Sequence, residues 1–163
     1  MAIRTRVGQG FDIHRFVDGS SDRVLVLGGV KFPGEKPLAG HSDADVIAHA
    51  AADALLGAAA LGDIGMHFPD TDPQWAGADS ITLLAHVAQL VRNAGYEIGN
   101  VDCSIVCEKP KIAPHRETMQ KLLSDAAGAT ITVKGRRAEG LGALGREEGI
   151  ACWAVAVIER TQA

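Results

Sequence analysis

Residues 41–65, HSDADVIAHAAADALLGAAALGDIG, form an alanine-rich segment interrupted by ionisable side chains. Small apolar residues at this density predict a helix that packs closely against its neighbours. Ser42 is a suitable N-cap, Asp45 follows at the position of a capping-box acid, and Gly62 marks the expected end. Polar groups among small apolar side chains must be solvated, paired or bound. Five residues therefore need an explanation: His41, Asp43, Asp45, His49 and Asp53.

Further helices and strands are expected on both sides of this segment. Helical spacing recurs at 79–94 and 114–128, with Gly95 and Gly128 as stops and Pro114 near the second start. Strand patterns occur at 4–14, 23–32, 101–107, 130–135 and 150–159. Within 23–32, Gly28–Gly29 is expected to turn, and the last two strands could pair antiparallel. The interleaving predicts an α+β fold with a mixed four-stranded sheet and helices on one face. The other face would need a partner.

Composition is that of an ordinary globular chain. The 163 residues suit one domain, 1–163, with 47% apolar and 22% charged residues. A formal charge of -4 argues against broad nucleic-acid binding, though not against a local anion pocket. Since no apolar run approaches ~20 residues and the N-terminus lacks a signal-peptide core, neither a membrane span nor secretion is expected. Three cysteines without a C-x-x-C pair favour reduced thiols in the cytoplasm.

One group of residues has the spacing of a metal site. In an extended FDIH segment, Asp12 and His14 point to the same side, and His49 could meet them from the helix. One carboxylate with two imidazoles suits zinc and leaves a fourth position open. Taken alone, His49 fits a core histidine better than a ligand, Asp45 fits a helix-capping acid better than a ligand, and Asp53 could orient His49. His41 precedes the helix start, where free N–H groups favour an anion.

Three polar loops offer further candidates, each with a solvated surface loop as the alternative. GDIGMHFPDTDP crowds carboxylates among glycine and proline and could hold hydroxyl groups. CEKPKIAPH would make a rigid basic loop. VKGRRAEGLGALGREEG could bring amides and guanidinium groups to a phosphate, and Glu139 could hold a harder ion such as magnesium. Nucleophile-elbow, Walker, dinucleotide and H-E-x-x-H motifs are lacking. Metal ions and positioning would then carry the chemistry.

The order and spacing of GFDIH, GHSDADVIAHAAADALLGAAALGDIG, FPDTDP, PKIAPH and GREEGIAC resemble the 2-C-methyl-D-erythritol 2,4-cyclodiphosphate synthase family from about Val7 to Ile158. The resemblance implies a cytoplasmic homotrimer whose sheets face the three-fold axis and whose active sites lie between subunits. It implies a phosphorus–oxygen lyase that converts 4-diphosphocytidyl-2-C-methyl-D-erythritol 2-phosphate to the cyclic diphosphate and CMP, in the non-mevalonate isoprenoid route. The substrate's own 2-phosphate would attack, so no protein nucleophile is needed.

The resemblance also implies a role for individual residues. Asp12, His14 and His49 would bind zinc and contact substrate, while Glu139 would position Mg²⁺ or Mn²⁺ between the α- and β-phosphates. His41 would stabilise the transition state, and Ser42 would contact phosphate. The erythritol portion would be held by Asp63, Ile64, Gly65, Phe68 and Asp70. Cytidine would be received by the loop with Cys107, Pro110, Lys111 and Ala113, and the substrate would also contact Arg136, Arg137 and Arg146.

Two departures from the family pattern leave alternatives open. Arg136-Arg137-Ala138-Glu139 stands where many members have Thr-Thr-x-Glu, so at Arg137 a long cation replaces a catalytic hydroxyl. Ala143 and Leu144 stand beside Arg146, where some members line an axial cavity for isoprenyl diphosphates with an aromatic residue. Two histidines and a carboxylate also suit a non-haem iron oxygenase. A non-catalytic module that binds CDP and zinc is the third possibility.

Overall fold

In the computed structural model, which describes residues 3–161, four strands form a mixed sheet. Its order is β1 (Ile3–Arg15), β6 (Gly149–Thr161), β4 (Glu97–Val106), β5 (Thr130–Arg136). β6 pairs antiparallel with both β1 and β4, and β4 pairs parallel with β5. The expected mixed four-stranded sheet is confirmed. The suggested pairing of the last two strands is wrong, because a helical crossover returns the chain parallel to β4 and β4 separates β5 from β6.

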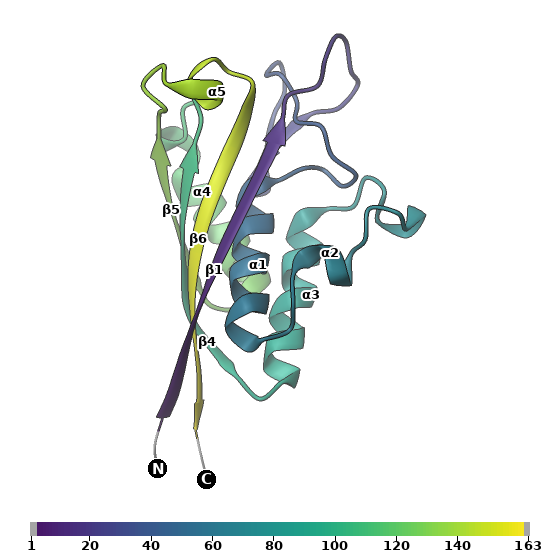
Figure 1. Cartoon of the computed structure of the whole chain (residues 1–163). Coiled ribbons are helices and arrows are strands. Elements are labelled where there is room, and N and C mark those ends of the chain that lie inside the picture. The colour runs from purple at the N-terminus through teal and green to yellow at the C-terminus, as the bar shows by residue number, and fades with distance from the viewer. Residues whose placement is uncertain (1–2, 162–163) are drawn as a thin grey trace.

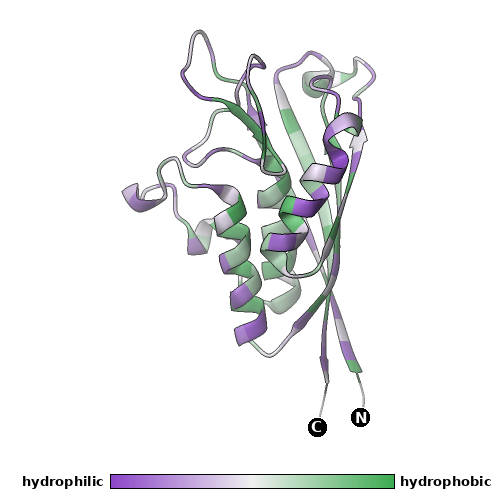
Figure 2. Ribbon diagram, turned by 180° about the vertical axis from the view of Figure 1, so that it is seen from behind, coloured by the Kyte–Doolittle hydropathy of each residue, from purple (hydrophilic) through white to green (hydrophobic). Residues whose placement is uncertain are grey.

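The long helices cover one face of the sheet, as Figure 1 shows. They are α1 (Val46–Ala59), α3 (Ser80–Asn93) and α4 (Arg116–Ala127). Figure 2 shows the same layer from behind, with hydrophilic residues on the outward sides of the helices. No helix within residues 3–161 is long and apolar enough to cross a membrane.

Shorter elements connect the layers. Segment 23–32 is a hairpin of β2 (Leu25–Leu27) and β3 (Val30–Phe32), which turns at Gly28 and Gly29 as expected and stays outside the main sheet. Pro114 lies in the 3₁₀ turn η2 (Ala113–His115), so the following helix begins two residues later than expected. The remaining pieces are α2 (Ile64–His67), η1 (Pro73–Trp75) and α5 (Gly142–Gly145).

The start of α1 differs from the sequence expectation. Asp45, and not Ser42, is the N-cap, and its carboxylate accepts the N–H groups of Ile47 and Ala48. The same fully buried carboxylate also accepts two N–H groups from the hairpin turn, at 2.9 Å from Gly28 and 2.7 Å from Gly29. Asp45 therefore joins α1 to the hairpin. The helix ends before Gly62, because Ala60 takes the left-handed conformation that closes it.

Contact between α1 and β1 depends on two glycines. A Cβ built on Gly8 would lie 2.0 Å from the carbonyl oxygen of Ala54, and one on Gly10 would lie 2.0 Å from that of Ala50. Such distances exclude any side chain at these positions, so helix backbone rests directly on strand backbone. This close approach is what brings His49 over the end of β1.

The opposite face of the sheet is open. On β1 and β6 it carries exposed apolar side chains, including Val7 (66% exposed), Phe11 (43%), Trp153 (42%) and Val155 (46%). The rings of Phe11 and Trp153 pack together with centroids 4.9 Å apart. Large exposed apolar patches mark interaction surfaces. The uncovered face expected from the sequence is therefore present and mainly apolar along these two strands.

Candidate active site

Three side chains meet where β1 passes beneath α1. Asp12 and His14 point to the helix side of the strand, and His49 projects from the first turn of the helix. One Asp12 carboxylate oxygen lies 3.2 Å from Nε2 of His14 and 3.0 Å from Nδ1 of His49. The three potential ligand atoms lie within 4.8 Å of one another. The convergence expected from the D-x-H spacing is confirmed. Asp12 and His14 share the side of β1 that faces α1, and α1 carries His49 on the surface that faces β1.

The electrostatics of this cluster favour a cation. Burial alone would raise the pKa of Asp12, but hydrogen bonds from His14 and His49 and their charge lower it to about 2. Burial disfavours the charged form of His14, yet the Asp12 carboxylate outweighs it and raises the His14 pKa. His14 Nδ1 faces the Ala39 carbonyl oxygen at 2.7 Å, which directs Nε2 toward Asp12. One carboxylate with two oriented imidazoles therefore fits a divalent metal ion.

The remaining nitrogen of His49 contacts serine, not Asp53. Nε2 lies 2.7 Å from the Ser80 hydroxyl and 3.2 Å from that of Ser42. Asp53 instead accepts the N–H of Ile64 at 3.0 Å, so the interpretation that it orients His49 is wrong. Sequence reasoning missed Ser80 because the only signal there was a helix start after Asp79.

A cavity of about 450 Å³ opens beside the three-residue cluster. Most residues expected around phosphate and erythritol line it: His41, Ser42, Ile64, Gly65, Phe68 and Asp70. Asp63 does not line it; this residue caps α2 by accepting the Met66 N–H. Trp75, Pro69 and Leu83 complete the wall and were not expected. Apolar surface with few polar groups is typical of a small-molecule site.

The start of α1 offers fewer free N–H groups to a phosphate than the sequence led us to expect. The Asp45 carboxylate already accepts from Ile47 and Ala48, the amides that would face an anion. The His41 ring is at the cavity wall, with Nε2 2.9 Å from the Asp72 carbonyl oxygen. The amides of Ile47 and Ala48 are therefore not free to contact an anion at this end of the cavity.

A second cavity, of about 190 Å³, lies between the ends of β4 and β5 and the loop before α4. Its lining includes every residue expected to receive cytidine, together with two expected arginines: Cys107, Pro110, Lys111, Ala113, Arg136 and Arg137. Glu108 accepts the Ala138 N–H at 2.7 Å and fixes the loop after β5. Burial, with a smaller effect of Glu108, raises the pKa of the Cys107 thiol to about 11. Cys103, Cys107 and Cys152 are buried free thiols.

Besides Asp63, two expected residues lie outside both cavities in the described part of the chain. Glu139 is exposed in the turn after β5, with a left-handed backbone (φ 55°). Arg146 is exposed as well and forms an ion pair with Glu148, with Nε 2.7 Å from the carboxylate. Neither belongs to the three-residue cluster. Their predicted roles require a ligand or another copy of the chain.

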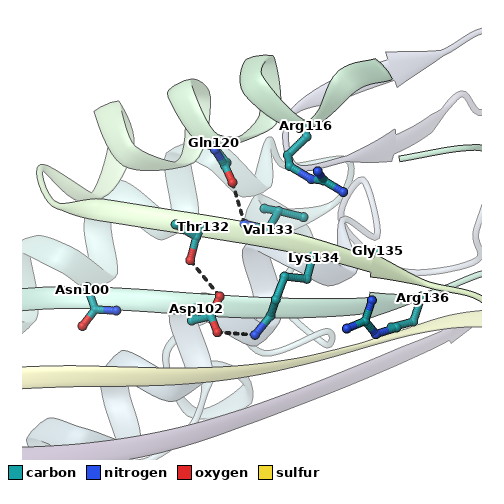
Figure 3. A pocket seen from close by; sticks show the side chains of 9 residues that line it. All are labelled: Asn100, Asp102, Arg116, Gln120, Thr132, Val133, Lys134, Gly135 and Arg136. Carbon is teal, nitrogen blue, oxygen red and sulfur yellow. Dashed lines mark hydrogen bonds and ion pairs between the residues drawn. The ribbon is translucent and has the colours of Figure 1, made fainter. Parts of the chain in front are cut away.

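A third cavity, of about 490 Å³, adjoins the second one and is shown in Figure 3. Arg116 and Arg136 line both. Its polar groups are largely paired with one another: Asp102 accepts from Thr132 and forms an ion pair with Lys134, and Gln120 accepts the Val133 N–H at 3.0 Å. The side chains of Asn100, Arg116 and Arg136 show no such link in Figure 3, and two of these three are cations. The cavity therefore extends the positive surface of the second cavity.

Comparisons with known proteins give a consistent result. A family model described as the YgbB family matches residues 5–159. A 2-C-methyl-D-erythritol 2,4-cyclodiphosphate synthase from Geobacillus thermodenitrificans is 52% identical over 161 residues, covering 97% of this chain and 99% of the relative. The Bacillus cereus protein of the same name is 54% identical over 158 residues, covering 95% and 98%.

Solved structures agree with these relatives. An IspF–CDP complex from Plasmodium falciparum superposes with a TM-score of 0.82 at 34% identity and 97% coverage of both chains. The bifunctional IspDF from Campylobacter jejuni gives 0.91 at 36% identity; the match covers 99% of this chain and 44% of that one.

Proposed function

The chain belongs to the YgbB family, and from this premise we propose that the Asp12–His14–His49 cluster and the cavities described above form the catalytic site of a 2-C-methyl-D-erythritol 2,4-cyclodiphosphate synthase. The enzyme converts 4-diphosphocytidyl-2-C-methyl-D-erythritol 2-phosphate to the cyclic diphosphate with release of CMP, in the non-mevalonate isoprenoid pathway. We assign it to the phosphorus–oxygen lyases, as a single cytoplasmic domain over 1–163. The observation that carries the assignment is the cluster opening into a cavity lined by the expected substrate residues.

Zinc is the ion that we propose for the cluster. Two imidazoles and one carboxylate are a zinc set with an open fourth position, whereas magnesium prefers oxygen ligands. A bound ion would stabilise negative charge on a substrate phosphate oxygen. Asp12 stays ionised down to a pH of about 2 and offsets part of the ion's charge.

The residues around the cluster would hold the substrate in its reactive geometry. Because the attacking phosphate and the attacked phosphorus belong to one molecule, most of the catalytic effect must come from orientation and charge stabilisation. His41 and Ser42 lie on the cavity wall beside the cluster and would contact phosphate. Phe68 and Trp75, whose ring centroids are 4.9 Å apart, form an apolar wall that would exclude water.

The second cavity would hold the cytidine diphosphate end. Lys111, Arg136 and Arg137 supply positive charge there, and the loop from Cys107 to Ala113 supplies backbone groups for the base. A neighbour of known structure is a complex with CDP, which supports this assignment. We propose that Glu139 positions Mg²⁺ or Mn²⁺ between the phosphates, and that Arg137 stabilises charge where many relatives use threonine.

The two cavities lie at opposite edges of the sheet. The first is built on β1 and the second on β5, the two outer strands, and no lining residue is shared. One substrate molecule could therefore contact both kinds of cavity only where the first cavity of one copy of the chain meets the second cavity of another copy. We propose a homotrimer with the open sheet faces toward the axis, which would also cover Val7, Phe11 and Trp153.

Mixing two inactive variants tests the reaction and the shared site together. His49→Ala disables the first cavity, and Ala113→Trp fills the second. Each alone should release little CMP from the diphosphocytidyl substrate with zinc and magnesium present. After equal amounts of the two variants are unfolded together and refolded, about a quarter of the interfaces should pair an intact first cavity with an intact second cavity. The mixture should then release CMP at about a quarter of the wild-type rate. Co-refolding that recovers nothing, although wild type refolds actively, would contradict the shared site. A wild-type protein that binds CDP and zinc without turnover would favour the binding module.

Zinc affinity is expected to fall as the pH drops through the raised pKa of His14. The pKa of His14 is raised, so at lower pH its Nε2 carries a proton and has no lone pair for the metal. Asp12, with a pKa of about 2, remains ionised over this range and does not cause the loss. Competition with a chelator at pH 8, 7 and 6 would measure the dependence. A constant affinity between pH 8 and 6 would rule out ligation by His14.

A further inference from the structure

A hydrogen-bonded chain extends behind His49, on the side away from Asp12. Nε2 of His49 lies 2.7 Å from the Ser80 hydroxyl, and that hydroxyl donates to an Asp43 carboxylate oxygen. Asp43 stands in the loop before α1, and Ser80 is the first residue of α3. His49 and Ser80 are buried, with exposed fractions of 9% and 1%. The hydrogen-bonded chain thus links three segments, with His49 and Ser80 shielded from water and Asp43 half-buried.

The Asp43 carboxylate, which can only accept hydrogen bonds, sets the direction of the hydrogen bonds in this chain. The Asp43 carboxylate already accepts the N–H groups of Ser80 at 3.0 Å and of Asp45 at 3.2 Å. Because an ionised carboxylate has no proton to give, the Ser80 hydroxyl must donate to it. Ser80 Oγ then has only lone pairs to offer His49. Nε2 must therefore carry a proton and donate it to Ser80, while a proton on Nδ1 would be donated to the Asp12 carboxylate, 3.0 Å away, until a metal ion replaced it.

We propose that Asp43 and Ser80 are positioning residues that hold a proton on Nε2 of His49, so that Nδ1, which faces Asp12, is the nitrogen that gives up its proton and binds the metal. This inference rests on the proposed function only in taking Nδ1 as a metal donor. Imidazole ligands are commonly held this way through their second nitrogen. Here the partner is a serine whose direction a carboxylate fixes.

Ser42 is the competing partner of Nε2 and is the weaker one. Its hydroxyl is 3.2 Å from Nε2, against 2.7 Å for Ser80. The Ser42 hydroxyl also accepts the Ala44 N–H at 3.3 Å, and no carboxylate contacts it within the described residues. Nothing comparable therefore fixes the direction of its O–H bond. Ser80 sets the tautomer, and Ser42 adds a second acceptor.

Zinc affinity, measured by chelator competition on the full chain, tests the proposal through Ser80→Ala. This variant keeps the Ser80 N–H bond to Asp43 but removes the hydroxyl, and its affinity should fall about 10–100-fold. Ser80→Thr retains a hydroxyl and should restore most of the affinity. Thr82→Ala is the matched control, because Thr82 is exposed on the same turn of α3 and bonds only to Asp79. Affinity in Ser80→Ala equal to wild type would overturn the proposal.

Nitrogen-15 NMR of the histidine rings gives a readout independent of metal and of activity. In the metal-free wild type at pH 7.5, Nε2 of His49 should carry a proton that exchanges slowly with water. Ser80→Ala should expose that proton to rapid exchange. Asp43→Asn should shift the proton population, because an amide can donate to Ser80 and turn its hydroxyl toward Nε2. An unprotonated Nε2 in wild type would overturn the proposal. A protonated Nε2 in a wild type that binds no zinc would uphold the chain and contradict the metal site instead.

Discussion

His49→Ala is expected to abolish zinc binding and to slow CMP release by about a thousandfold or more. Removing the imidazole leaves two donors, Asp12 and His14, because the cluster found within residues 3–161 holds three ligand residues. Two side chains bind a divalent ion too weakly to keep it at low concentration, and the charge stabilisation it supplies is lost with it. Zinc content of the purified protein and chromatographic detection of CMP would measure the two effects.

His86→Ala is the matched control for that variant. His86 lies on α3, where its ring meets Phe68 edge-on with centroids 5.6 Å apart, and it is not part of the cluster. This variant should keep one zinc per chain and lose activity by a small factor at most. Circular dichroism must show both variants folded. If His49→Ala kept its zinc and its rate, the assignment of the three residues as the metal site would be wrong.

The metal cluster could be predicted because its geometry is mostly local. Side chains two apart on a strand share a side, so Asp12 and His14 needed no tertiary information. His49 needed only the assumption that the following helix packs on that strand. Asp53 was misassigned because spacing places it on the same stripe of α1 as His49, whereas its actual partner, the Ile64 N–H, depends on how the loop returns. Ser80 lies 31 residues from His49, and that contact exists only once α3 packs beside α1.

The strands could also be located from the sequence, but their order could not. Apolar alternation identifies β1, β4, β5 and β6, while pairing is decided by non-local contacts and by the helical crossover before β5. The N-cap of α1 could not be predicted from the sequence either, although capping involves residues close together in the chain. Ser42 and Asp45 are both good caps by residue type. The hairpin turn decides between them, because Gly28 and Gly29 bond to Asp45.

Gly10→Ala is expected to lower the free energy of unfolding by about 3 kcal/mol or more. The added Cβ would lie 2.0 Å from the carbonyl oxygen of Ala50 and 2.7 Å from the backbone nitrogen of Ala54. Both atoms are helix backbone, so no rotamer change relieves the clash, and α1 must move away from β1. Ala50 directly follows His49, so this movement separates His49 from Asp12. Zinc affinity should therefore fall together with stability, although no metal ligand is altered.

Gly57→Ala separates this effect from a general sensitivity of α1 to alanine. Gly57 is also a glycine at this contact, but a Cβ there would meet only the Gln9 carbonyl oxygen, at an ordinary 3.8 Å. Because alanine favours a helix interior over glycine, this variant should be up to about 1 kcal/mol more stable, with unchanged zinc affinity. Urea denaturation and chelator competition on both variants would measure the contrast. If Gly10→Ala unfolded at the wild-type urea concentration and bound zinc normally, the close approach of α1 to β1 would not be what assembles the metal site.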